Sequence, residues 1–253
     1  MRRYATKIKT WLLIGAMGGL LWTAPLQAGS IGVSPTLDPN SNDFVLLDDL
    51  VSGESPGVIV GDKCFTEFFY SGLGDMPDAQ EVKVYGFEDV NGNFGLSFHG
   101  TFIDLPGSAA SDALLRFTVS VMPDALQQGY RISDAHLFMG GAGAGDNSVV
   151  TVDESFQEND ETLNVFFSTL GEGGQQTSDW VFFDEVYESL RVTKDIFALA
   201  GSGSIRQAGT SVIDQSFSQT REPVPEPVTA VLMTLGALSL ANLARRERSP
   251  DVG

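Results

Sequence analysis

Oxygen-bearing side chains around one glycine form the best local arrangement in the chain for binding a metal ion. Asp89, Asn91 and Asn93 alternate around Gly92, so several oxygen atoms can point to one side of a turn. Calcium prefers carboxylate and carbonyl oxygens, so this turn is the candidate calcium site of a chain that is otherwise expected to need no cofactor. The distal glutamate of an EF-hand loop is missing, and an Asn-Gly hairpin turn accounts for the same residues without an ion.

Histidine and cysteine are too rare for the usual zinc, copper or nucleophilic sites. His99 and His136 are the only histidines and stand far apart, so each is expected to be a strand residue with a local hydrogen bond. The glycine-rich stretch 141–145 lacks the Lys-Ser/Thr of a phosphate loop and is expected to be a simple loop. Cys64 is the only cysteine, which excludes an intramolecular disulfide, and we expect it to be buried as a small apolar residue.

Carboxylates and aromatic side chains leave two kinds of polysaccharide chemistry open. A pair of carboxylates could hydrolyse glycosidic bonds without histidine, but acidic residues are so numerous that any one choice is arbitrary. The adjacent pairs Asp153–Glu154 and Asp184–Glu185 are expected to be solvated. Trp180 is the candidate for stacking on a sugar ring. Most other aromatic residues are Phe, which suits a core better than a wet sugar platform.

Short strands must position these residues. Leu115 to Val121 alternates apolar and polar side chains, as a half-buried strand does. Similar runs, rich in β-branched or aromatic residues and separated by Gly, Pro and Asn turns, occur at 81–85, 131–139, 163–168, 180–183, 189–192 and 211–217. Roughly ten such strands predict an all-β fold, an antiparallel β-sandwich with a jelly-roll-like arrangement. Single helical turns are expected at 123–128 and 184–189.

The N-terminal end has the pattern of a secretory signal. Arg2, Arg3, Lys7 and Lys9 precede an apolar run from Trp11 to Trp22, and Ala28 provides a small residue for cleavage. This order predicts an N-terminal signal helix in residues 1–28 that signal peptidase removes after Ala28. An uncleaved N-terminal anchor is the alternative.

The C-terminal end has the pattern of a membrane segment. Residues 228–244 are uncharged and mostly apolar, and 17 residues are just enough for a single transmembrane helix. The basic residues Arg245, Arg246 and Arg248 follow and predict a stop on the cytoplasmic side. We therefore expect residues 228–248 to be a transmembrane helix with its basic stop, and the body to lie on the outer face of the membrane.

The tail as a whole resembles a known sorting signal. Val224, Pro225, Glu226 and Pro227, followed by the apolar helix and the Arg cluster, resemble the PEP-CTERM sorting domain of Gram-negative bacteria. The resemblance covers only this tail, and Glu247 interrupts its basic cluster. It implies that an exosortase, an integral-membrane transpeptidase-like enzyme, removes the tail near Pro225–Pro227. It also implies a bacterium that makes extracellular polysaccharide, biofilm or floc. An ordinary membrane anchor without processing is the alternative.

The body is similar to uncharacterised domains found in front of this tail. The similar stretches are 62–65, 95–100, 192–196 and 213–219. That group has no assigned activity, so the resemblance implies a location and a β fold and supplies no chemistry. The expected organisation is a signal peptide at 1–28, a β-sandwich domain at 29–220, a linker with the motif at 221–227 and the membrane segment at 228–248.

The charge of the body limits its partners. Between residues 29 and 222 there are eight basic residues and 30 acidic ones, a net charge of −22 against −18 for the whole chain. Such a surface repels nucleic acid and anionic lipid, and nucleic acid is excluded as a partner.

The sequence therefore predicts a non-enzymatic, exported protein of the cell surface or extracellular matrix, associated with biofilm or exopolysaccharide. Its expected partners are the secretion translocon, signal peptidase, the inner membrane transiently, exosortase and extracellular polysaccharide. A carbohydrate-binding module and a secreted polysaccharide-active enzyme are the alternatives.

Overall fold

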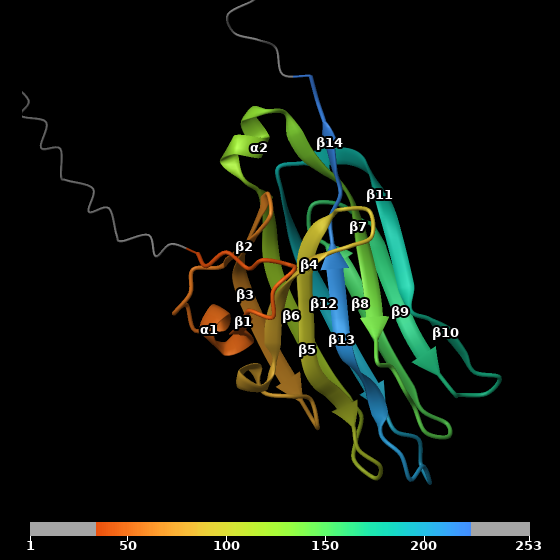
Figure 1. The fold of residues 1–253 in the computed structure, drawn as a ribbon. Helices are drawn as coiled ribbons and strands as arrows, with labels where there is room; N and C mark the ends of the chain where they lie inside the picture. The colour runs from red at the N-terminus through yellow and green to blue at the C-terminus, as the bar shows by residue number, and fades with distance from the viewer. Residues whose placement is uncertain (1–33, 224–253) are drawn as a thin grey trace, which may run out of the picture. The chain divides into compact units, whose positions relative to one another are not determined.

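Two antiparallel sheets of seven strands each pack face to face in the part of the chain that the computed structural model describes, residues 34–223 (Figure 1). The predicted signal peptide, sorting motif and transmembrane segment lie outside the described residues. Within residues 34–223, the helices are all too short or too polar to cross a membrane.

The first sheet carries the site discussed below. Its strand order is β1, β4, β5, β13, β7, β11, and β14 also pairs with β7. The bounds are β1 (Phe44–Leu46), β4 (Lys83–Glu88), β5 (Phe94–Asp104), β13 (Ala208–Ser216), β7 (Tyr130–Gly140), β11 (Ser178–Tyr187) and β14 (Gln219–Arg221).

The second sheet covers the inner face of the first. Its order is β10, β9, β8, β12, β6, β3, β2. The bounds are β10 (Gly174–Gln176), β9 (Thr162–Ser168), β8 (Val149–Phe156), β12 (Ser189–Leu199), β6 (Ser111–Val121), β3 (Lys63–Leu73) and β2 (Val58–Val60). Short helices α1 (Leu47–Val51), α2 (Pro123–Gln127) and a 3₁₀ turn (Ala79–Glu81) join strands.

The order of the strands is that of a jelly roll. The chain crosses between the sheets from β5 to β6, β7 and β8, and again from β11 to β12 and β13. As a result β5, β13, β7 and β11 lie side by side in one sheet, and β6, β12, β8 and β9 lie side by side in the other. This interleaving of two Greek keys confirms the predicted jelly-roll-like sandwich.

The core forms where the inward positions of the two sheets meet. In β6, Leu115, Phe117 and Val119 are buried while Arg116 is exposed, as the period-two pattern predicts. The ring of Phe117 lies 5.9 Å from the ring of Phe98 on β5 of the opposite sheet. Such interdigitation of the two inner faces is what holds a sandwich together.

Two local expectations were wrong. Residues 184–189 do not form a helical turn: β11 runs on to Tyr187, which pairs with Ile132, and β12 begins at Ser189. The β-branched and aromatic residues Val186 and Tyr187 favour a strand there. Cys64 is half-buried rather than buried, because it occupies an outward position of β3 between the buried Lys63 and Phe65. The helical turn near Pro123 is confirmed by α2.

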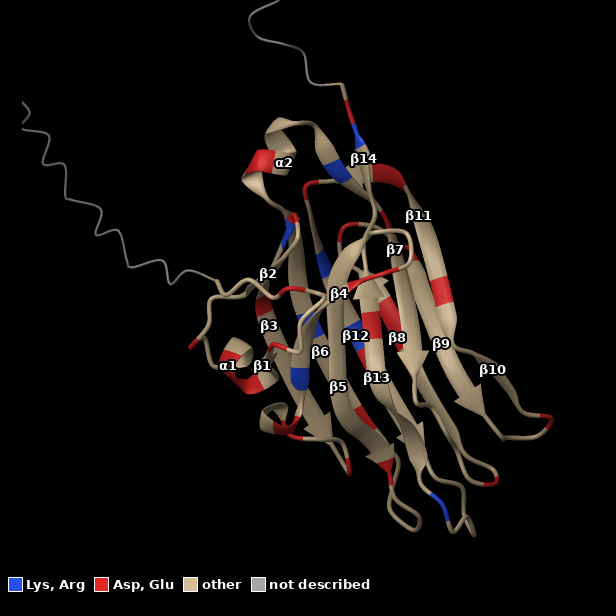
Figure 2. Ribbon diagram, viewed as in Figure 1, with Lys and Arg blue, Asp and Glu red and all other residues tan. Residues whose placement is uncertain are grey.

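Acidic side chains outnumber basic ones across both sheets and their loops (Figure 2). The strand β14 includes Arg221, and the N–H of Glu222 donates to the carbonyl of Gly129. The predicted linker therefore begins with residues that still pair with the sandwich.

Candidate functional site

The outer face of the first sheet brings together side chains from strands that are distant in sequence. Cross-strand pairing places two adjacent rows on this face. One row consists of Trp180, His136, Ser216 and Gly95, and the other of Ser178, Phe138, Asp214 and Ser97. Directly paired residues point to the same side of a sheet, so aromatic and hydrogen-bonding groups alternate across one surface.

A groove of about 400 Å³ lies over these rows. The turn that follows β4 contributes Asp89 and Asn91, and the strand faces contribute Phe138, Trp180 and Asp214. We call this feature the sheet groove, defined by these five residues. Its volume lies within the range of ordinary small-molecule sites, about 300–1,000 Å³.

Aromatic side chains on this face are unusually exposed. Trp180 is 58% exposed, Phe182 is 63% exposed and Phe138 is 43% exposed. The Trp180 and Phe182 rings meet edge to face, with centroids 5.0 Å apart and planes at 70°. Trp180, which the sequence singled out, is thus on the surface, and it has aromatic neighbours that sequence reasoning missed.

The floor of the sheet groove carries a partly buried carboxylate. Asp214 accepts a hydrogen bond from the hydroxyl of Ser97, and that hydroxyl also lies 2.9 Å from His99 Nε2. Burial raises the pKa of Asp214 above its usual range. His99 therefore has the local hydrogen bond expected of a strand histidine.

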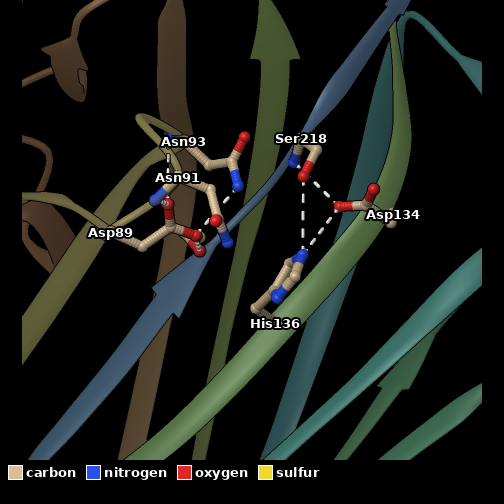
Figure 3. Close-up of polar contacts among 7 residues, drawn as sticks. Asp89, Asn91, Asn93, Asp134, His136 and Ser218 are labelled. Atoms are coloured by element: carbon tan, nitrogen blue, oxygen red, sulfur yellow. Dashed lines mark hydrogen bonds and ion pairs between the residues drawn. The ribbon is translucent and has the colours of Figure 1, made fainter.

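His136 sits at the edge of the groove in a small polar network (Figure 3). Its Nε2 lies 3.1 Å from Asp134 Oδ1 and 3.4 Å from the hydroxyl of Ser218, whose backbone N–H also donates to Asp134. The hydrogen bond to Asp134 raises the pKa of His136. Burial raises the pKa of Asp134, but hydrogen bonds from His136 and Ser218 outweigh it and leave the pKa lowered.

This network does not have the geometry of a hydrolytic triad. In a triad the serine and the carboxylate contact opposite nitrogens of the imidazole ring. Here Ser218 and Asp134 both face Nε2 of His136 (Figure 3). The network is instead a second example of the local hydrogen bonding expected for a strand histidine.

The predicted calcium ligands lie together in the turn between β4 and β5 (Figure 3). Asp89 Oδ1 accepts the backbone N–H groups of Asn91 and Asn93 at 2.8 and 3.0 Å. Its Oδ2 accepts the Asn93 amide at 2.9 Å and the Ser216 hydroxyl at 2.8 Å. Gly92 has a φ of 84°, a conformation that glycine adopts without strain. Burial raises the pKa of Asp89, but these hydrogen bonds together lower it.

The calcium site remains a prediction. The hydrogen bonds of Asp89 account for the turn by themselves, as the hairpin alternative required. Within residues 34–223, His, Cys, Asp and Glu form no group of three or more that could hold a metal ion. An ion would therefore depend on the Asn91 and Asn93 oxygens and would compete with four donors for Asp89.

The carboxylate pairs behave differently from each other. Asp184 and Glu185 are exposed, as expected. Asp153 is exposed too, but the expectation for Glu154 was wrong, because it is fully buried beside Lys194. The alternation of β8 places Glu154 in phase with the inward-facing Val152. That phase is visible in the sequence and could have revealed the buried charge.

Comparison with known proteins gives no family. No protein-family model and no curated protein matches the chain. Similar solved structures include a family 61 carbohydrate-binding module in complex with β-1,4-galactotriose, at 15% identity and a TM-score of 0.30, covering 61% of this chain and 88% of that one.

Two further solved structures are similar to this chain. One was solved in work on the promiscuous specificity of carbohydrate-binding modules from the β-sandwich superfamily. Its sequence identity is 12% and its TM-score is 0.26, and the match covers 61% of this chain and 57% of that one. The other is the family 11 carbohydrate-binding module from Clostridium thermocellum in complex with a β-1,3-1,4-mixed-linked tetrasaccharide. Its sequence identity is 7% and its TM-score is 0.23, and the match covers 63% of this chain and 91% of that one. At such low scores the function must be argued from the residues of this chain.

Proposed function

We propose that the sandwich binds polysaccharide along the sheet groove, and that the chain is an exported, non-enzymatic protein of the cell surface or extracellular matrix. The observation that carries the binding proposal is the exposure of Trp180 and Phe138, which both line one groove that also holds carboxylates. Sugar rings present apolar faces of C–H groups and rims of hydroxyls. Aromatic rings beside hydrogen-bond acceptors match both parts.

The charge of the groove selects among polysaccharides. Asp89, Asp179 and Asp214 line it, and no Lys or Arg of residues 34–223 does. Carboxylates accept hydrogen bonds from hydroxyl groups and repel other carboxylates. The preferred ligand is therefore a neutral, hydroxyl-rich glycan rather than an acidic one.

A larger cavity elsewhere fits this role less well. It has a volume of about 540 Å³ and lies among the loops near Gly141 and Arg206. Aromatic and acidic side chains are both absent from its lining within the described residues. The sheet groove is thus the better candidate for sugar stacking, although it is smaller.

Intrinsic fluorescence tests the binding proposal directly. Trp180 is the only tryptophan between residues 29 and 222, so after signal removal its emission reports the groove alone. Titration with soluble neutral polysaccharides should shift or quench this emission in a saturable way. An unchanged spectrum across neutral glucans, galactans and mannans, with equally flat calorimetric titrations, would overturn the proposal.

Export and processing complete the proposal. The supporting features are the basic and apolar pattern before Ala28, the Val224–Pro227 motif and the Arg cluster that ends at Arg248. The protein would pass through an inner-membrane intermediate and then lose its tail to exosortase. Mass spectrometry of the secreted form decides this, because a chain that still ends at Gly253 contradicts sorting by exosortase. Release of reducing ends from a matrix polysaccharide by the purified protein would contradict the non-enzymatic assignment.

A further inference from the structure

Three polar side chains meet in the middle of the core. Lys194 on β12 and Glu154 on β8 are direct cross-strand partners in the second sheet, and Gln215 projects from β13 in the first sheet. All three are fully buried. The Lys194 amine contacts Glu154 Oε2 and Gln215 Oε1, so one amine joins a carboxyl group and a carboxamide across the sandwich.

The cluster is incompletely satisfied as a hydrogen-bond network. Glu154 Oε1 and Gln215 Nε2 are buried and have no hydrogen-bond partner among the described residues. Buried polar atoms are normally paired, and a half-satisfied buried network is less favourable than an apolar core. A network that served only to hold the sheets together would be expected to use both atoms. No hydrogen bond among the described residues holds the amide nitrogen of Gln215 in place.

Burial also sets the protonation states. It lowers the pKa of the Lys194 amine, although the nearby Glu154 opposes this, and it raises the pKa of Glu154, although Lys194 opposes that. The pair is therefore biased toward a neutral amine and a neutral carboxylic acid. A neutral amine is nucleophilic, and a buried carboxylic acid can give and take protons.

We propose that Lys194 and Gln215 form an intramolecular amide cross-link between the two sheets, with Glu154 as the proton-transfer residue. The lone pair of Lys194 Nζ attacks Cδ of Gln215, which forms a new carbon–nitrogen bond. Glu154 protonates the departing Nε2 and accepts a proton from Nζ. The bond from Cδ to Nε2 breaks and ammonia leaves. Nothing is oxidised or reduced, and Glu154 ends in the protonation state in which it began.

The cross-link would supply a covalent tie that this chain cannot obtain from cysteine. Cys64 is alone, so no intramolecular disulfide is possible. Lys194 and Gln215 lie on different sheets, and joining them fastens one layer of the sandwich to the other. Unlike a disulfide, an amide resists reducing agents.

Mass spectrometry of the purified full chain tests the proposal. The intact mass should be lower, by one molecule of ammonia, than the mass calculated from the sequence of the observed termini. Trypsin does not cut after an acylated lysine, so a digest should contain a branched species in which residues 192–206 are joined to residues 207–221. A loss of ammonia from the peptide 207–221 is not sufficient evidence, because Gln207 at its N-terminus can cyclise and lose ammonia by itself. The branched peptide is therefore the decisive signal.

The unlinked outcome is equally distinct. A full intact mass, with residues 192–194 and 207–221 released as separate peptides, would overturn the proposal. So would a branched species that lacks one molecule of water and joins Lys194 to Glu154. These measurements need only the wild-type protein and stay decisive even where a variant fails to fold.

Variants then assign the role of each group. Glu154→Gln keeps the size of the side chain but removes the proton-transfer acid, so the branched species should disappear. Lys194→Met should also abolish it. Asp153→Asn changes the neighbouring, solvent-facing carboxylate of the same strand and should leave the cross-link at the wild-type level. Cross-linking that persists in Glu154→Gln would remove Glu154 from the mechanism.

Discussion

The rings of Trp180 and Phe182 contact each other edge to face at a centroid distance of 5.0 Å, yet each side chain is more than half exposed. They point outward from the same strand, β11, at alternate positions. Their contact fixes the orientation of two large apolar surfaces that water still covers. A pair of this kind is preorganised for a flat apolar ligand, because a rigid platform loses little conformational entropy on binding.

Truncation of Trp180 in this aromatic pair should therefore weaken binding while leaving the stability of the fold nearly unchanged. Trp180→Ala should weaken polysaccharide binding tenfold or more, since central aromatic anchors typically contribute about 2 kcal/mol or more. The free energy of unfolding should change by only about 0.5 kcal/mol, as for other exposed positions. Affinity electrophoresis and chemical denaturation measure the two effects.

The matched control for Trp180→Ala is Phe69→Ala. Phe69 is 45% exposed but belongs to β3 of the second sheet, away from the groove. Its truncation should leave binding unchanged. Equal losses of binding affinity in the two variants would point to a general effect of surface hydrophobicity and would contradict binding in the sheet groove.

Stability should depend on pH through His136. Its pKa is raised above 6.5 by the hydrogen bond to Asp134, with a smaller contribution from Asp89. This stabilisation is complete below the unfolded value near 6.5 and is lost as pH rises through the folded pKa. Asp134 has a lowered pKa, so its contribution is present above 3.8 and is lost as pH falls through the folded value.

Thermal unfolding curves measured between pH 5 and pH 8.5 check this reasoning. The melting temperature should fall toward the alkaline end of that window, and His136→Gln should flatten this part of the profile. The same alkaline fall in wild type and variant would show that other groups cause it.

The turn at Asp89 should be held by hydrogen bonds alone. Asp89→Ala removes the acceptor for the backbone N–H groups of Asn91 and Asn93 and for the Ser216 hydroxyl. The expected loss is about 1–3 kcal/mol in the free energy of unfolding, the usual cost of leaving part-buried donors unpaired. Denaturant titration in the presence of a chelator measures it.

The same variant tests the predicted calcium site. If the hydrogen bonds suffice, millimolar calcium should leave the melting temperature of the wild type unchanged. A rise with calcium that is absent in Asp89→Ala would instead establish the ion, with Asn91 and Asn93 as its further ligands.

The sequence predicted individual strands better than it predicted which strands lie next to each other in the sheets. Alternation within Leu115 to Val121 follows from local sterics and burial, so that strand could be predicted from its own residues. The site depends instead on which strands lie side by side. Asp214 pairs with Phe138 and with Ser97 across three strands that are far apart in the chain, and no local pattern encodes that register. Trp180 was predictable from its type alone.

The buried cluster shows a different limit. Lys194 is in phase with the inward-facing Val192 and Ile196, so its burial could be predicted, but the general rule that lysine is exposed argued against it. That rule fails when a partner is available. Glu154 lies opposite on β8 and Gln215 on the other sheet, and only the jelly-roll order brings them to Lys194.

The carboxylate of Asp214 should be needed in its charged form for binding. It lies on the floor of the groove next to Phe138, where sugar hydroxyls can donate to its free oxygen. Asp214→Asn should weaken binding roughly tenfold, since a hydrogen bond to a charged group contributes about 1.5–3 kcal/mol. Because burial raises its pKa, binding by the wild type should fall as pH decreases through that raised value, whereas Asp214→Asn should lack this fall.

Asp195 provides the matched control for that pH dependence. Burial and the neighbouring Asp112 raise its pKa to about 6, so its pKa is shifted in the same direction as that of Asp214, but Asp195 lies on the exposed face of the second sheet. Asp195→Asn should leave both the affinity and its pH profile unchanged. If Asp195→Asn flattened the profile and Asp214→Asn did not, the glycan would bind to the second sheet, where Asp195 lines a separate hollow with Asp153 and Asn164.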